Sequence, residues 1–145
     1  MKPPISTIGY ELDTLDGVIG RLKAAGVEML VDVRAVASSR RPGFSKTLLG
    51  ASLKAEGIDY VHLRPLGTPK AGREAARAGR TDEMRAIFRA HLAEPEVQVA
   101  LGQATALAGD RRIALLCYEH EARCCHRAIV ADEIRTRLKC EVVDL

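Results

Sequence analysis

The stretch Ile113-Ala114-Leu115-Leu116-Cys117 decides the fold, because it is an unbroken apolar run of strand length. Such a run is typical of a parallel strand that is buried on both faces. Apolar residues at helical spacing follow it, over a helix that we expect to begin at Cys124 or Cys125 and to continue through Leu138. A buried strand that leads into a helix is the repeating unit of an α/β fold.

Working outward, short apolar runs predict four more strands, at Ile5–Tyr10, Val27–Val33, Tyr60–Leu63 and Glu141–Leu145. Helical spacing between capping and breaking residues predicts helices from Asp13 or Thr14 to Gly26, from Phe44 or Ser45 to Gly57, from Thr81 or Asp82 through Leu92, and from Pro95 through Leu107. Prolines and glycines predict irregular structure over Arg64–Gly79. The alternation predicts a single three-layer α/β/α domain over residues 1–145, with a mainly parallel sheet of about five strands.

Composition excludes several classes of protein. The chain has 145 residues and only 3% aromatic residues, too few for a stacking platform that binds single-stranded nucleic acid. No apolar run approaches the ~20 residues of a membrane span, and the N-terminus has no apolar segment of signal-peptide length. Three of the four cysteines lie between residues 117 and 125, whereas a disulfide framework would be spread along the chain. We therefore expect reduced thiols and a cytoplasmic location, with no membrane partner.

The net charge of +3 is unevenly distributed. Arg34–Lys46 contains four basic residues and no acid, and Arg64–Arg89 contains seven basic residues and three acids. Two basic segments favour an anionic ligand. For the arginines of the second segment, a solvated helix face is the alternative interpretation; these are Arg73, Arg77, Arg80 and Arg85.

Polar residues fall where the first two strands end, and ligands of parallel α/β sheets bind at the carboxyl ends of strands. Tyr10 ends the first strand and offers a hydroxyl group. Asp32 and Arg34 share one face at the end of the second strand, and Arg40 lies in the loop that follows. We expect Arg34 and Arg40 to hold a phosphate while Asp32 orders one of them. An internal salt bridge between Asp32 and an arginine is the alternative.

The segment from Cys117 to Arg127 is the strongest candidate for chemistry. Glu119 lies two residues beyond Cys117 and could act as general acid or base, or orient His126. His126 and Arg127 fall in the first turn of the last helix, where unpaired backbone donors favour an anion. A Cys125 thiol at a helix N-terminus has a lowered pKa, which favours a nucleophilic thiolate. The alternatives are apolar packing of Cys117 and Cys125, and a structural ion pair between Glu119 and Arg127.

Zinc is a second interpretation of this segment, and it is not favoured by the sequence. Structural zinc sites usually show two paired Cys spacings, and no second cluster exists here. On a helix, the adjacent Cys125 and His126 would also point in different directions. We therefore expect no cofactor.

Four sets of residues together carry a resemblance to a known family. They are Thr7-Ile8-Gly9-Tyr10; Asp32-Val33-Arg34 with Ser39-Arg40 and Pro42-Gly43-Phe44-Ser45; Leu66-Gly67; and Cys117-x-Glu119 with Cys125-His126-Arg127. In this order, and over essentially the whole chain, they resemble the domain of unknown function 488 family. The resemblance implies a three-layer α/β fold and supplies no established reaction.

Three classes of function follow as expectations. The first is a small enzyme, a hydrolase or transferase, that acts on a small anionic, phosphate-bearing or nucleotide-like molecule. Its catalytic residues would be Cys117, Glu119, Cys125 and His126, and its ligand-binding residues Tyr10, Asp32, Arg34, Arg40 and Arg127. The second is a non-catalytic module that binds a nucleotide or nucleic acid through the two basic segments. The third is a Cys-dependent redox or sulfur-transfer protein. The sequence carries no indication of the oligomeric state.

Overall fold

A five-stranded parallel sheet forms the centre of the molecule. The computed structural model describes residues 2–145, and its strands lie in the order β3-β2-β4-β1-β5. The strands are β1 (Ile5–Gly9), β2 (Met29–Asp32), β3 (Asp59–His62), β4 (Ile113–Cys117) and β5 (Val142–Asp144). Every pairing between neighbours is parallel. The predicted α/β class and the parallel sheet are therefore confirmed.

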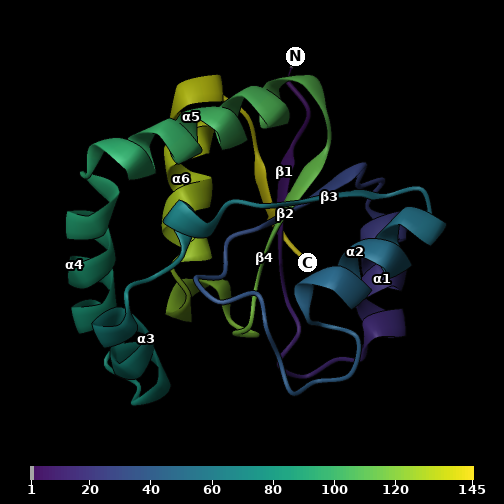
Figure 1. Ribbon diagram of the computed structural model, residues 1–145. Coiled ribbons are helices and arrows are strands. Elements are labelled where there is room, and N and C mark those ends of the chain that lie inside the picture. Colours follow the sequence, from purple (N-terminus) through teal and green to yellow (C-terminus); the bar gives the residue numbers. More distant parts are fainter. Residues whose placement is uncertain (1) are drawn as a thin grey trace.

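Helices cover both faces of the sheet (Figure 1). One face carries α1 (Leu15–Ala24) and α2 (Lys46–Ala55), and the other carries α5 (Pro95–Asp110) and α6 (Arg127–Leu138). Outside the second face lie α3 (Lys70–Arg77) and α4 (Thr81–Leu92), which pack against each other. None of the helices formed by residues 2–145 is both long and apolar enough to cross a membrane.

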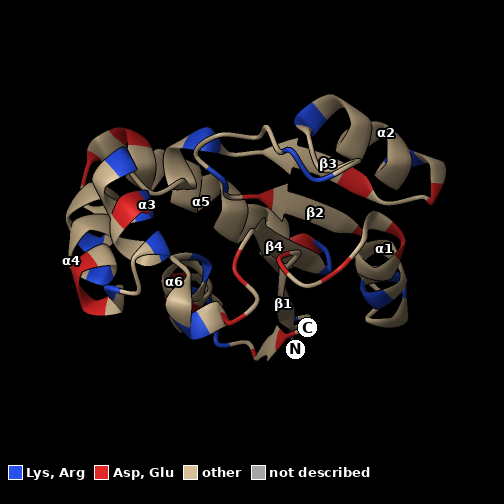
Figure 2. Ribbon diagram, turned by 90° about the horizontal axis from the view of Figure 1, so that it is seen from below, with Lys and Arg blue, Asp and Glu red and all other residues tan. Residues whose placement is uncertain are grey.

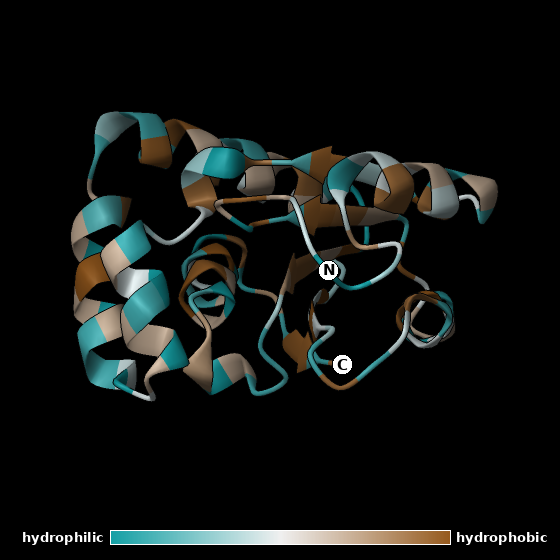
Figure 3. Ribbon diagram, turned by 60° about the horizontal axis from the view of Figure 1, so that its bottom comes forward, coloured by the Kyte–Doolittle hydropathy of each residue, from teal (hydrophilic) through white to brown (hydrophobic). Residues whose placement is uncertain are grey.

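Each face of the sheet has its own apolar core. Along β4, Leu116 faces the core under α1 and α2, whereas its neighbour Leu115 faces the core under α5 and α6. This alternation follows from the two-residue period of a strand, and it explains why β4 is apolar at every position. In Figure 3 the strands at the centre are accordingly brown, and the helices around them are mixed in colour.

Two neighbouring strands are followed by helices on opposite faces of the sheet. β1 and β4 are adjacent, with Gly9 opposite Cys117. After β1 the chain continues to α1 on one face, and after β4 it continues to α6 on the other. A crevice at the carboxyl ends of the strands is the usual consequence of such a switch point, and it is the usual place for a ligand in these folds.

The structure differs from the sequence prediction over residues 64–79. Arg64–Leu66 is a short 3₁₀ helix and Lys70–Arg77 is α3, although glycines and prolines predicted irregular structure there. Gly72 lies inside α3. A Cβ atom at this position would stand 2.2 Å from Cγ2 of Thr68, so the packing here requires glycine. This glycine is required by close packing and does not mark a break in the helix.

The last helix also begins later than predicted. It starts at Arg127 with His126 as its N-cap, after a 3₁₀ turn at Ala122–Cys124, whereas the pattern predicted a start at Cys124 or Cys125. Cys125 therefore has an extended backbone, with φ −127° and ψ 145°.

Candidate functional site

A cavity of about 490 Å³ opens at the carboxyl ends of β1, β2 and β4. Its wall contains most of the predicted site residues, namely Tyr10, Arg34, Arg40, Cys117, Glu119, Cys125 and His126. Two arginines of α3, Arg73 and Arg77, complete its charged lining. Figure 2 looks onto this end of the molecule and shows α3 and α4 to one side of the sheet. The volume lies within the usual range for small-molecule sites.

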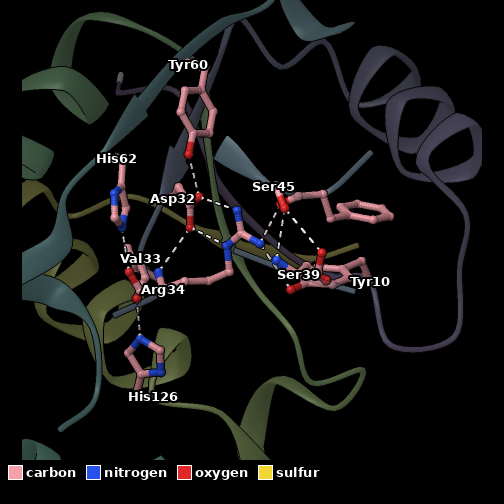
Figure 4. A network of polar contacts seen from close by, with 10 residues as sticks. Tyr10, Asp32, Val33, Arg34, Ser39, Ser45, Tyr60, His62 and His126 are labelled. Atoms are coloured by element: carbon pink, nitrogen blue, oxygen red, sulfur yellow. Dashed lines mark hydrogen bonds and ion pairs between the residues drawn. The ribbon is translucent and has the colours of Figure 1, made fainter. Parts of the chain in front are cut away.

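Asp32 and Arg34 form a buried ion pair beneath the cavity (Figure 4). The guanidinium donates through Nε and Nη2 to the two carboxylate oxygens of Asp32, at 2.9 and 2.7 Å. Its Nη1 donates to the Tyr10 hydroxyl oxygen at 3.1 Å and to the Phe44 carbonyl at 2.7 Å. Tyr60 donates its hydroxyl to Asp32 at 2.6 Å. The internal salt bridge is therefore formed, and all three guanidinium nitrogens of Arg34 are engaged with protein.

The charges of this pair perturb their surroundings. Burial alone would lower the pKa of Arg34, but the hydrogen bonds and the charge of Asp32 outweigh it and raise the pKa above its ordinary value. Burial and the neighbouring Asp32 carboxylate raise the pKa of Tyr60. Arg34 is thus held permanently charged, and the Asp32 carboxylate balances its charge.

The loop after β2 leaves one arginine free at the cavity. Ser45 accepts from the Ser39 amide at 3.1 Å, and Arg41 donates to the Asp13 carbonyl at 3.0 Å, so the loop is tied both to itself and to the loop after β1. Arg40 projects from this braced loop and is exposed. Among residues 2–145 it has no ion-pair or side-chain hydrogen-bond partner.

The two α3 arginines face Arg40 from a distant part of the sequence. Arg73 donates to the Thr68 carbonyl at 2.8 Å, which holds its side chain toward the cavity. Arg77 is exposed one turn further along α3. Within residues 2–145, none of Arg40, Arg73 and Arg77 has a carboxylate within ion-pair distance. A bound anion would therefore meet three arginines that have no internal counter-charge.

Two thiols and an imidazole lie together at the floor of the cavity. Nδ1 of His126 lies 3.9 Å from Sγ of Cys117 and 3.7 Å from Sγ of Cys125. Nε2 of His126 lies 2.7 Å from the Val33 carbonyl, which can only accept, so Nε2 carries a proton and Nδ1 faces the sulfurs. All three side chains are buried.

The side chains at this floor shift one another's pKa values. Burial would raise the pKa of Cys125, but the hydrogen bond from Cys117 and the charge of His126 outweigh it and lower the pKa well below its usual value. The hydrogen bond to Cys125 and burial raise the pKa of Cys117. Burial would lower the pKa of His126, but the Cys125 thiolate raises it. Burial and the Cys125 thiolate raise the pKa of Glu119 to about 7. Cys125 is the more acidic of the two thiols.

Two predicted site residues lie behind the cavity wall. Asp32 is fully buried in its ion pair. Arg127 is 1% exposed and donates to the backbone carbonyls of Glu119 and His120, so it holds the loop between β4 and α6 in place. The ion pair considered for Glu119 and Arg127 is absent from residues 2–145, because Arg127 contacts the Glu119 carbonyl instead of its carboxylate. We infer that Asp32 and Arg127 position the residues that line the cavity.

Sequence reasoning missed Arg73 and Arg77 as site residues. Their helix was not predicted, and their charge also fits a solvated helix face. The excess of basic residues over Arg64–Arg89 was the available signal. Thr68, Met84 and Tyr118 also line the cavity, and no motif pointed to them.

A second cavity of about 660 Å³ adjoins the first and shares Ala35, Val36, Thr68 and Arg73 with it. Its wall includes Glu94 and Glu96, whereas Glu119 is the one acidic residue that lines the first cavity. The first cavity is therefore the better candidate for an anion.

The fold and the site define a doubly wound α/β protein with an arginine-lined cavity at the carboxyl ends of its strands. A family model described as "Domain of unknown function DUF488" matches residues 14–134. The chain belongs to this family, as the sequence motifs predicted. Comparisons with curated proteins and with solved structures give no match.

Proposed function

We propose that this protein is a small enzyme that acts on a phosphate-bearing, nucleotide-like ligand in the first cavity. One observation carries the proposal. The same cavity combines three arginines that lack internal counter-charges with a floor of ionisable side chains. A site that served binding alone would not need Glu119, Cys125 and His126 beneath the anion. The four free cysteines support a cytoplasmic location.

The roles follow from position. Arg40, Arg73 and Arg77 hold the phosphate, and Arg34, paired with Asp32, forms part of the cavity wall. Glu119 is the one carboxylate that faces the cavity, so it is the candidate general acid or base for a hydrolase or transferase reaction.

The binding step is tested by calorimetric titration with pyrophosphate, adenosine monophosphate and a single-stranded oligonucleotide. Hydrogen bonds to charged groups contribute about 1.5–3 kcal/mol each, so the double variant Arg73→Gln/Arg77→Gln should bind at least about tenfold more weakly. Arg137→Gln is the matched control, because Arg137 is exposed at the far end of α6.

Equal affinity of the double variant and the wild type, or no binding of any probe, contradicts the proposal. Preference for the oligonucleotide, with strong salt dependence, would instead favour the nucleic-acid-binding module. In that case Glu119→Gln should leave the affinity for each of the three probes unchanged.

A Cys-dependent redox or sulfur-transfer activity is the second candidate. The 3.7 Å contact of Cys125 with His126 favours it, because a thiol beside an imidazole is activated as a nucleophile. Thiol titration of the native protein distinguishes this activity from the proposed reaction on a phosphate-bearing ligand. Rapid modification of Cys125 favours sulfur chemistry, and inert thiols remove it.

A further inference from the structure

Cys117, Cys125 and His126 bring three potential metal-ligating atoms together. Their two Sγ atoms and a ring nitrogen all lie within 4.8 Å of one another. Cys117 is the last residue of β4, and the other two immediately precede or cap α6. Among residues 2–145, no other group of three or more potential metal-ligating side chains comes together in this way.

The convergence depends on where α6 begins. On a helix, the adjacent Cys125 and His126 would diverge, and this argued against a metal. In the structure Cys125 is extended and His126 is the N-cap, so both side chains turn toward Cys117.

Hydrogen bonds join the three side chains of this cluster to one another. Nδ1 of His126 can share one proton, yet the sulfurs of Cys117 and Cys125 both lie against it. A single cation between the three atoms would use the lone pairs of all of them.

The two sulfur–nitrogen distances suit such a cation. Zinc bonds of about 2.3 Å to sulfur and about 2.1 Å to nitrogen, at a tetrahedral angle, place S and N roughly 3.6 Å apart. The observed separations are 3.7 and 3.9 Å. The hydrogen bond from Nε2 of His126 to the Val33 carbonyl also fixes the orientation of the ring, as such a bond usually does for a metal-binding histidine.

We propose that Cys117, Cys125 and His126 bind one zinc-class divalent ion. Two thiolates and an imidazole are a donor set that zinc takes. All three residues also line the cavity, so the fourth coordination position opens into it, beside Glu119. Three protein ligands with an open position define a catalytic rather than a structural zinc site.

The metal would supply an activated water, and Glu119 is placed to exchange a proton with it. This role rests on the proposed function and narrows it to a hydrolase. The metal site itself stands independently of anion binding.

The chain provides its own controls, because Cys124 and Cys140 are free thiols outside the cluster. The reduced, metal-free protein is titrated with Zn²⁺ against a chromophoric chelator, and with Co²⁺ while its absorption spectrum is recorded. We expect one ion per chain, with thiolate-to-cobalt charge-transfer bands and the intense visible bands of tetrahedral Co²⁺.

Cys117→Ser, Cys125→Ser and His126→Gln should each weaken zinc binding by more than about 100-fold, which exceeds the effect of losing a residue that only orients a metal ligand. Cys124→Ser and Cys140→Ser should bind like the wild type. Circular dichroism checks that each variant is folded.

No ion bound by the folded wild type overturns the proposal, whatever the variants do. Equal loss in Cys124→Ser, or retention in folded Cys125→Ser, overturns it as well. Pyrophosphate binding is measured in a separate titration of the metal-free protein. Zinc binding can therefore fail while anion binding succeeds, and the reverse.

Discussion

At the scale of single residues, Asp32 is the side chain on which the cavity wall depends most. Its carboxylate accepts from the guanidinium and the backbone amide of Arg34 and from the Tyr60 hydroxyl, and it is fully buried. Removing one partner of a buried ion pair leaves an uncompensated charge, which costs far more than the pair contributes.

We expect Asp32→Asn to lower the free energy of unfolding by about 3–5 kcal/mol. The matched change is Asp132→Asn, which breaks an exposed pair with Arg135 and should cost no more than about 1 kcal/mol. Urea denaturation followed by circular dichroism measures both. If the two variants lost similar amounts of unfolding free energy, the buried network around Asp32 would contribute no more to stability than an exposed ion pair does.

Sequence alone could predict the residues that follow strands. Tyr10, Arg34 and Glu119 fall one to two residues beyond apolar runs, so their place at the sheet edge follows from strand geometry. The sequence could not show that Arg34 is saturated by protein partners while Arg40 is free, because that depends on how the loop after β2 folds back.

At the scale of elements, the end of β1 packs directly against the loop that joins β4 to α6. A Cβ atom on Gly9 would lie 1.8 Å from the carbonyl oxygen of Glu119. The same carbonyl accepts from Arg127, so the loop cannot shift without losing that hydrogen bond. Gly9 therefore sets the position of Glu119 at the cavity.

Gly9→Ala should destabilise the protein by about 1–3 kcal/mol, the usual cost of overpacking. It should also weaken zinc and pyrophosphate binding, because the loop carries the floor of the cavity. Gly20→Ala is the control, since Gly20 is exposed in α1 and a Cβ atom there meets nothing within 4 Å. That change should stabilise the protein by up to about 1 kcal/mol. Thermal unfolding compares the two, and a stable Gly9→Ala variant with unchanged ligand binding would contradict this account of the loop.

The sequence prediction missed α3 and placed the start of α6 too early, in both cases because the local sequence pattern was ambiguous. α3 contains Gly72, whose role is close packing against Thr68, and a single sequence does not distinguish that role from helix breaking. The start of α6 was placed too early because Cys124 and Cys125 are not strong capping residues, and the 3₁₀ turn at Ala122–Cys124 leaves no clear pattern.

At the scale of the whole molecule, the alternation of strands and helices was enough to predict a parallel sheet with helices on both faces. It did not give the strand order β3-β2-β4-β1-β5, which depends on β4 inserting between β1 and β2. That insertion brings Cys117 next to Gly9 and creates the switch point. It also brings residues from the N-terminal and C-terminal thirds of the chain to one cavity.

We propose that one cavity holds the anion above the two thiols and the imidazole. The most direct measurement is a crystal structure of the protein grown with pyrophosphate. We predict electron density for the probe in the first cavity, bonded to Arg73 and Arg77 and within reach of Glu119. Density in the adjoining cavity beside Glu94, or at a surface site away from both cavities, would contradict the account.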